Sequence, residues 1–402
     1  MQGRAVSGAM FLMATSAIGP GFITQTTQFT AQLGAAFAFA ILASILVDLA
    51  LQLNVWRVIG VSGLRAPELG NRVLPGAGHV LTFCVVLGGL VFNVGNVAGC
   101  GLGLDALLGL PPRWGGAVSA ALAVGVFLSR RAGVAMDRIV VVLGLVMIAM
   151  SGYVAWVSSP PLGAALRNAV LPEEVDVLAI TTLVGGTVGG YITYAGAHRL
   201  LDAGVQGLGH VGVIARASVQ GVLLTGLMRI LLFLAVFGVV AAGTRLDPAN
   251  PAASAFAAAA GGFGRRVFGL ILWAAAITSV IGASYTSVSF VVAGHERLVR
   301  WRGVLVVAFI ALSTVVFLTA GAAPVSLLVF AGAFNGLILP VGVAALLWVA
   351  YRRADLLHGY AYPRALAALG LAAWLVTVYL GLESVDRLGA LLDQAVTAPL
   401  AP

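Results

Sequence analysis

Two glycine-rich segments contain the residues best suited to bind a ligand. Residues 17–22 read AIGPGF, and residues 185–191 read GGTVGGY. Inside a helix, glycine costs about 1 kcal/mol and proline about 3 kcal/mol relative to alanine, so each segment predicts a helix break. A break leaves backbone N–H and C=O groups without helical partners. Such groups can coordinate an ion or form hydrogen bonds to a polar solute.

Polar and aromatic side chains accompany both predicted breaks. The predicted binding residues are Gly19, Pro20, Gly21, Phe22, Thr24, Gln25 and Gln28 at the first break, Thr187, Gly189, Gly190, Tyr191 and Tyr194 at the second, and Asn93 and Asn96 from a third segment. Their amides and hydroxyls would supply hydrogen bonds, and the rings would form walls. The apolar segments contain no nucleophile–base pair and no cluster of metal ligands. We therefore expect no enzymatic activity, no cofactor and no resident metal.

The elements that position these residues are membrane helices. The chain has 402 residues, of which 60% are hydrophobic and only 9% charged, which is typical of a membrane protein. A membrane-spanning helix needs about 20 mostly apolar residues, and the sequence contains about eleven such windows. They are residues 8–32, 35–56, 78–104, 114–129, 136–157, 178–197, 212–243, 267–292, 303–321, 325–350 and 364–382. We predict an all-α integral membrane protein with polar loops over 57–77, 159–177 and 244–266.

The two breaks fall in the first and sixth windows, which are equivalent positions if the chain contains two repeats. We predict one transmembrane domain over residues 1–402, with repeat one over about 8–157, repeat two over about 178–350 and an extra helix over 364–382. Paired interrupted helices in matching halves indicate a transport site near the bilayer midplane. The alternative is that the glycines only allow close packing between helices.

The formal net charge of +8 reflects membrane orientation and not nucleic-acid binding. All 22 basic residues are arginines, and apart from Arg229 they are scattered through short connections. Of these arginines, 15 fall on the side of the N-terminus and 6 on the other side. Arginines favour the cytoplasmic side. We therefore predict a multi-pass protein of the cell (inner) membrane, with a cytoplasmic N-terminus, an extracellular C-terminus and the lipid bilayer as its partner.

Asp48 and Arg229 are charges predicted to lie inside the membrane, in the second and seventh windows. A charge in the bilayer is costly, so each side chain should face the interior of the helix bundle. The second and seventh helices are equivalents in the inverted repeat. The two charges could form a direct ion pair. Alternatively, they could take part in proton coupling or bind a charge of the substrate.

At the two breaks the sequence resembles the Nramp family of proton-coupled divalent-metal transporters, which have the LeuT-type fold. The family's first helix carries Asp-Pro-Gly-Asn where this chain has Gly19-Pro20-Gly21-Phe22. Its sixth helix reads Ala-Thr-Val-Met-Pro-His where residues 186–191 read GTVGGY, and Tyr194 keeps the place of the following tyrosine. The resemblance extends over nearly the whole chain and implies a 5+5 inverted repeat with broken helices 1 and 6.

The family's metal ligands are missing from this chain. Its metal-binding Asp, Asn and Met correspond to Gly19, Phe22 and Gly189, and the acidic pair of its third helix corresponds to Asn93 and Asn96. A dehydrated divalent cation without a carboxylate would face a severe desolvation cost. Replacing side chains by glycine predicts a larger cavity lined by backbone, and free N–H groups at helix ends favour a carboxylate.

We therefore predict a secondary transporter that moves a small organic solute, an amino acid or a related carboxylate, by alternating access. One alternative is a divalent metal transporter for a Mn²⁺- or Mg²⁺-like ion that keeps most of its water. The other is a non-transporting membrane sensor. Because the family's usual proton route is absent, coupling to a proton, to sodium or to no ion remains open.

Overall fold

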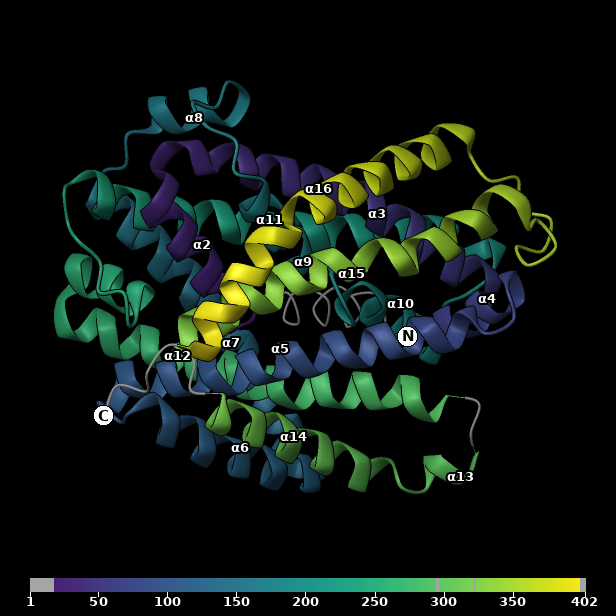
Figure 1. The fold of residues 1–402 in the computed structure, drawn as a ribbon, viewed down its shortest axis with the longest axis horizontal. Helices are drawn as coiled ribbons and strands as arrows, with labels where there is room; N and C mark the ends of the chain where they lie inside the picture. The colour runs from purple at the N-terminus through teal and green to yellow at the C-terminus, as the bar shows by residue number, and fades with distance from the viewer. Residues whose placement is uncertain (1–17, 294–295, 321–322, 398–402) are drawn as a thin grey trace.

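The chain folds into a bundle of helices (Figure 1). The computed structural model describes residues 18–293, 296–320 and 323–397, and these residues form helices and connections with no β-strand. The start of the first predicted window and repeat, residues 8–17, lies outside the described residues. The helices run in two opposite senses along a common direction, as expected for repeated membrane crossings.

Over its described residues, each predicted apolar window coincides with one helix or, for the sixth window, with two. The long elements are α2 (Pro20–Leu33), α3 (Phe37–Ser62), α5 (Ala77–Leu108), α6 (Pro112–Leu128), α7 (Arg130–Ser158), α9 (Val177–Val188), α10 (Ile192–Asp202), α11 (Val211–Ala241), α12 (Pro251–Val292), α14 (Arg302–Thr319), α15 (Pro324–Arg352) and α16 (Arg364–Thr397). The sixth window is divided into α9 and α10, which confirms the predicted break.

By length and apolar composition, the described residues contain eight helices able to cross a membrane, or nine if one bent pair is included. This number is lower than eleven for two physical reasons. The continuous stretch Pro20–Ser62 contains two predicted windows, which are separated by the 3-10 turn η1 (Gly34–Ala36). Helix α6 is apolar but has only 17 residues. The protein is a multi-pass membrane protein.

The three segments predicted as polar loops each contain helix, so this prediction was wrong. The connections hold α4 (Ala66–Val73), α8 (Leu162–Val170) and the first turns of α12. Helix α12 starts at Pro251, where the Asn250 side chain accepts a hydrogen bond from the Ala253 N–H, and it is interrupted at Ala260 and Gly261. Proline at the first position and an asparagine cap stabilise a helix start even where the sequence is not strongly apolar.

The helices form two groups that meet at the predicted site. Helices α5, α6, α12 and α14 pack together, while α3 packs against α9 and α11, and α2 packs against α11. In Figure 1, α6 and α14 lie along the bottom of the bundle, α3 and α16 lie towards the top, and α5 and α15 run between them. Helix α15 contacts α2, α5 and α9 and therefore connects the groups.

Helices α9 and α15 approach each other at glycine positions. A Cβ atom on Gly185 would overlap the backbone oxygen of Gly332 and the backbone nitrogen of Gly336, and one on Gly336 would overlap the Thr181 carbonyl oxygen. Small residues allow two membrane helices to approach at backbone distance. The alternative explanation of the glycines, close packing, is therefore correct for these positions.

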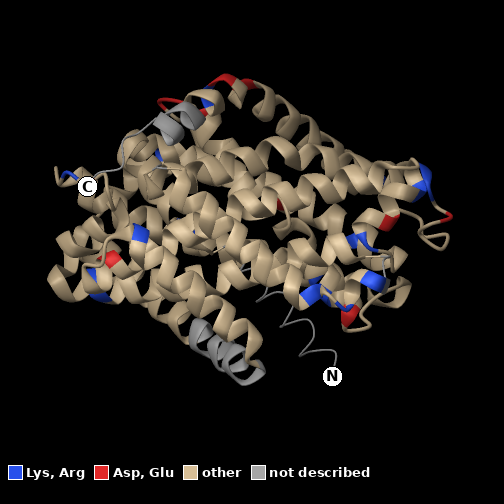
Figure 2. Cartoon of the chain, turned by 60° about the horizontal axis from the view of Figure 1, so that its bottom comes forward, with Lys and Arg blue, Asp and Glu red and all other residues tan. Residues whose placement is uncertain are grey.

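Charged residues gather towards the ends of the helices, and the middle of the bundle is mostly free of them (Figure 2). At one end, Arg65 pairs with Asp202, and Arg353 donates a hydrogen bond of 2.5 Å to the backbone oxygen of Arg72. Elsewhere, Arg387 pairs with Asp176 at 2.9 Å. In each contact, both partners come from the same predicted side of the membrane.

Replacing Gly185 with alanine should destabilise the protein. The added methyl group meets backbone atoms that cannot rotate away, so we expect a loss of about 1–3 kcal/mol in the free energy of unfolding. Thermal unfolding of the detergent-purified variant measures this loss. Gly125→Ala on α6 is the control, because a Cβ atom there meets open space. Equal melting temperatures for the two variants would contradict the packing of α9 on α15.

Candidate substrate site at the two helix breaks

The first break is a change from extended to helical backbone at the start of α2. Gly19 is extended, with φ −95° and ψ −175°, and Pro20 occupies the first turn. Proline suits this position because it has no N–H to leave unpaired. Its ring packs on α5 at Gly99, where a Cβ atom would overlap it. The close contact between Pro20 and Gly99 holds the start of α2 against α5.

The second break consists of Gly189, Gly190 and Tyr191. Gly189 is extended, and Gly190 has a φ of +55°, which side chains rarely adopt. The chain re-enters a helix when the Ile192 N–H donates to the Gly189 carbonyl at 3.2 Å. Gly189 and Gly190 thus form a sharp turn between α9 and α10, in which Gly190 has the left-handed conformation.

Two residues that the sequence analysis missed lie at these breaks. A Cβ atom on Gly21 or Gly190 would lie 3.9 or 3.8 Å from the Phe92 ring, so Phe92 of α5 lies beside both breaks. Its ring also meets Tyr191 edge-on, with ring centroids 6.0 Å apart. Asn335 of α15 packs against Gly190. A lone amide in an apolar helix, between Gly332 and Gly336, was the sequence signal for Asn335.

The expected extra room beside Gly189 and Gly190 is absent, so this prediction was wrong. A Cβ atom on Gly189 would lie 2.9 Å from Cβ of Asn335. The Asn335 amide is held there by donating to the Gly88 and Ala331 carbonyls at 3.1 and 2.8 Å. Side chains from α15 fill the space that the glycines leave.

Gln25 fills a second gap between the same helices. Its side chain lies against Gly186 of α9 and Gly332 of α15, where added Cβ atoms would overlap it. Its Nε2 donates to the Leu328 carbonyl at 2.8 Å, while its Oε1 is buried and has no hydrogen-bond partner. The first break is therefore connected to α9 and α15 through one amide.

Asp48 lies at the second break. The Thr187 hydroxyl, two residues before Gly189, donates a hydrogen bond of 2.7 Å to Asp48 Oδ2. The other carboxyl oxygen, Oδ1, is buried without a hydrogen-bond partner. Asp48 is thus a buried carboxyl group on α3 that reaches the end of α9.

Arg229 lies at the first break. Its guanidinium carbon lies 4.5 Å from the centroid of the Phe22 ring, and its Nη1 donates to the Ser44 hydroxyl at 3.4 Å. The ion pairs within 4.0 Å among the described residues do not include Asp48 with Arg229. The expectation of a direct ion pair was wrong, because each charge is held by a different neighbour.

Asn93 and Asn96 lie on α5, and Asn93 joins three helices. Its amide donates to Ser284 of α12 at 3.0 Å and to Ser313 of α14 at 3.1 Å. The amide nitrogen of Asn96 is buried and unpaired. Where the resemblance implies two acids, this chain has a neutral network between α5, α12 and α14.

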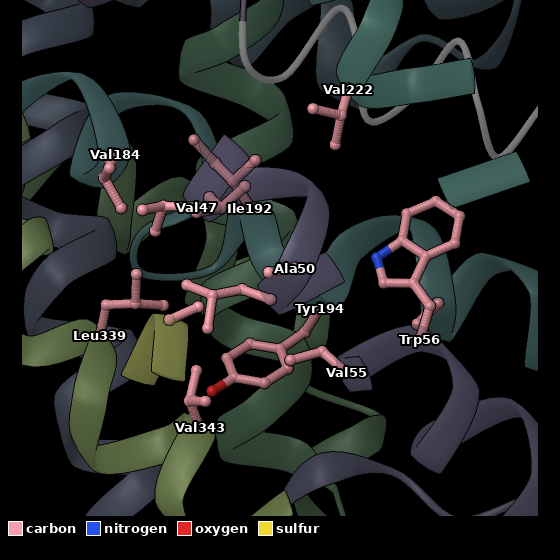
Figure 3. Packing of buried hydrophobic residues seen from close by; sticks show 14 of the residues in the cluster. Val47, Ala50, Val55, Trp56, Val184, Ile192, Tyr194, Val222, Leu339 and Val343 are labelled. Atoms are coloured by element: carbon pink, nitrogen blue, oxygen red, sulfur yellow. The ribbon is translucent and has the colours of Figure 1, made fainter. Parts of the chain in front are cut away.

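The remaining predicted residues lie around this centre. Thr24 is buried, and Gln28 is partly exposed on α2. Tyr194 lies one turn beyond the second break, in the hydrophobic core, with Val55 and Val343 beside it (Figure 3). Its ring packs on His198 and Phe290. The structure thus places Tyr194 in a packed cluster beyond the break.

Side chains that bind metals do not gather in the part of the chain that the structure describes. It contains no group of three or more His, Cys, Asp and Glu side chains that could hold an ion. The two cysteines are free, and Cys100 is buried. The site instead combines amides, hydroxyls, aromatic rings, one carboxyl group and one guanidinium group.

Solved structures share this arrangement of helices. The manganese transporter of Eremococcus coleocola, in complex with an aromatic bis-isothiourea substituted compound, superposes with a TM-score of 0.77 at 16% identity, covering 96% of this chain and 86% of that chain. MhsT in complex with L-phenylalanine superposes with a TM-score of 0.63 at 16% identity, covering 96% and 98%. The fold is of the LeuT type, with broken helices 1 and 6.

The sequence comparisons identify the family. The model of natural resistance-associated macrophage protein-like (Nramp) sequences matches residues 10–385, so the chain belongs to the Nramp family. A Bacillus subtilis (strain 168) relative, described as uncharacterized membrane protein YcsG, is 50% identical over 378 residues, covering 94% of this chain and 93% of its own. An uncharacterized membrane protein of Haemophilus influenzae (strain ATCC 51907 / DSM 11121 / KW20 / Rd) is 49% identical over 381 residues, covering 95% of each.

A double-mutant cycle tests the packing of Gln25 on α9. Gly186→Ala alone should destabilise the protein by about 1–3 kcal/mol, because the methyl group overlaps the Gln25 amide. In a Gln25→Ala background the same change should cost little, which gives a coupling of about 0.5–3 kcal/mol. Thermal unfolding of the four proteins measures it. Gly282→Ala, which meets open space, should be additive with Gln25→Ala, and additivity for Gly186→Ala would refute the contact.

Proposed function

We propose that this protein is a secondary transporter that moves a small organic solute, an amino acid or a related carboxylate, across the cell membrane by alternating access. The observation that carries the proposal is the chemistry at the two breaks. The positions that hold metal ligands in the resemblance are Gly19, Phe22 and Gly189. Among the described residues, the carboxyl group of Asp48 lies at the second break and the guanidinium group of Arg229 lies at the first.

The cost of removing water from a divalent cation disfavours metal binding at this site. A divalent cation that loses its water needs several oxygen, nitrogen or sulfur ligands and a neutralising charge. One carboxyl group beside a buried arginine supplies little net negative charge, and the arginine repels a cation. An organic carboxylate is attracted by the same arginine and by the N–H groups at the starts of α2 and α10.

The second candidate is a divalent metal transporter. It is supported by the family and by the higher TM-score of the manganese transporter, 0.77 against 0.63 for MhsT. In this case a Mn²⁺-like ion would keep most of its water and be bound by backbone oxygens, Gln25 and Asn335. The third alternative, a non-transporting sensor, has no specific observation in its favour.

The proposal includes the setting of transport. We place the protein in the cell (inner) membrane, with the N-terminus in the cytoplasm and the C-terminus outside, in agreement with the arginine distribution. A proton or sodium ion is the candidate coupling ion. The neutral network around Asn93 offers no carboxyl group for a proton, so Asp48 is the residue we would test first for coupling.

Binding and uptake by the purified protein test the proposal. Thermal unfolding is followed with amino acids, small mono- and dicarboxylates, Mn²⁺ and Mg²⁺, because a ligand at 100 times its Kd stabilises by about 2.7 kcal/mol. Uptake of radiolabelled ligands, and of Mn²⁺ with an enclosed dye, is then measured in liposomes. We expect stabilisation and saturable uptake of an organic carboxylate, and neither for the metals. Uptake of Mn²⁺ without any organic solute would overturn the proposal and establish the second candidate.

A variant locates the uptake at the first break. Gly19 has an extended backbone that other residues adopt, so Gly19→Val should fold. It adds side-chain volume at the first break and should reduce uptake at least tenfold, which corresponds to about 1.4 kcal/mol. Gly125→Val on α6 is the matched control. Full uptake by Gly19→Val would place transport elsewhere in the bundle.

A further inference from the structure

We propose that Arg229 binds the carboxylate of the transported solute and that Asp48 accepts a hydrogen bond from an N–H group of the same solute. The substrate class is then a small carboxylic acid with an N–H donor near its carboxylate. The inference rests on the proposed function, and it assigns the two buried charges to two ends of one ligand.

The unpaired atoms of Arg229 form a ready carboxylate site. The side chain is 1% exposed, and Nη1 is taken by Ser44. Within the described residues, Nε and Nη2 have no hydrogen-bond partner. These two nitrogens point their hydrogens from the same edge of the planar guanidinium group, which is the geometry that holds both oxygens of a carboxylate.

The Phe22 ring is a direct neighbour of the guanidinium group. The guanidinium carbon lies over the ring, 4.5 Å from its centroid, which is a cation–π contact. Phe22 follows directly after Gly19, Pro20 and Gly21. The free edge of Arg229 is therefore held at the break where helix α2 begins.

Asp48 offers the complementary atom. Its Oδ2 accepts a hydrogen bond from the Thr187 hydroxyl, and its Oδ1 is buried and has no partner among the residues that the structure describes. Asp48 follows Ser44 by four residues on α3, so the two side chains lie on the same face, one turn apart. Ser44 contacts Arg229, and Asp48 contacts Thr187, so this face of α3 connects the two breaks.

A ligand can pair the unpaired atoms of Asp48 and Arg229, which do not contact each other. A buried charge with unpaired hydrogen-bonding atoms is destabilising, so unpaired atoms on both groups favour a ligand that can bind them. Asp48 and Arg229 attract each other through space, but they make no contact within 4.0 Å in the described part of the chain. A cation would satisfy Asp48 alone, and a simple anion would satisfy Arg229 alone. A carboxylate with an N–H donor satisfies both.

Trios of related compounds test this assignment on the full-length protein. Each trio consists of an amino acid, its carboxamide and its des-amino carboxylate, for alanine, leucine and phenylalanine. Affinities are measured by thermal stabilisation and competition of uptake. In the wild type we expect the amino acid of at least one trio to bind about 30-fold or more tightly than its carboxamide.

Variants of the two residues identify which one binds the carboxylate of the ligand and which one binds its amino group. In Arg229→Gln, the ratio of the affinities for acid and carboxamide should fall to about twofold or less. In Arg229→Lys, this ratio should lie between those of the wild type and of Arg229→Gln, because lysine keeps the charge but lacks the planar guanidinium group. In Asp48→Asn the discrimination between amino acid and des-amino acid should fall instead. Arg216→Gln, an exposed arginine on the same helix, should keep both.

The outcomes separate this inference from the proposed function. If the wild type binds an organic acid and the Arg229 variants discriminate as the wild type does, Arg229 is structural and the inference is wrong, while the proposed function stands. If no acid binds the wild type, both are wrong. If Arg229→Gln does not fold, as judged by its elution and melting curve, Arg229→Lys and Asp48→Asn carry the test.

Discussion

The structure depends on one constraint, which is that backbone N–H and C=O groups at membrane depth must find partners inside the protein. Helices satisfy these groups by themselves, so a chain that interrupts two helices must supply other partners at both places. Here residues of α5 and α15 pack against both places. Pro20 removes one N–H and packs on Gly99, and the sharp turn at Gly190 lies against Phe92 and Asn335. The breaks persist because neighbouring helices enclose them.

The close approach of α15 to α9 leaves gaps that polar side chains fill. Glycines at 185, 332 and 336 bring two backbones together, and long amides, Gln25 and Asn335, occupy the gaps that remain. Both amides donate to backbone carbonyls, and both leave a buried oxygen without a partner. A site built this way has buried polar atoms available at both breaks.

Membership of the Nramp family favours a metal ion as the substrate, whereas the chemistry of the site favours an organic solute. The fold carries over because it depends on apolar helices and on the positions of the breaks, both of which tolerate large sequence change. Metal binding depends on a few side chains, and this chain has Gly19, Phe22 and Gly189 at the positions that the resemblance assigns to ligands. Fold similarity at 16% identity therefore supports the architecture, while the substrate must be argued from Phe22, Asp48 and Arg229.

The membrane class, most of the apolar helices and the two breaks could be predicted from the sequence. These features are local, because the cost of glycine or proline in a helix is set by the residue itself. Which side chains meet depends on how the helices pack. Gln25 and Leu328 are 303 residues apart, and Asp48 and Thr187 are 139 apart. Helices that are apolar all round carry no polar face to reveal their rotation, so Phe92 and Asn335 were missed, and an ion pair was expected between Asp48 and Arg229. Packing set those rotations and turned the two charges towards different breaks.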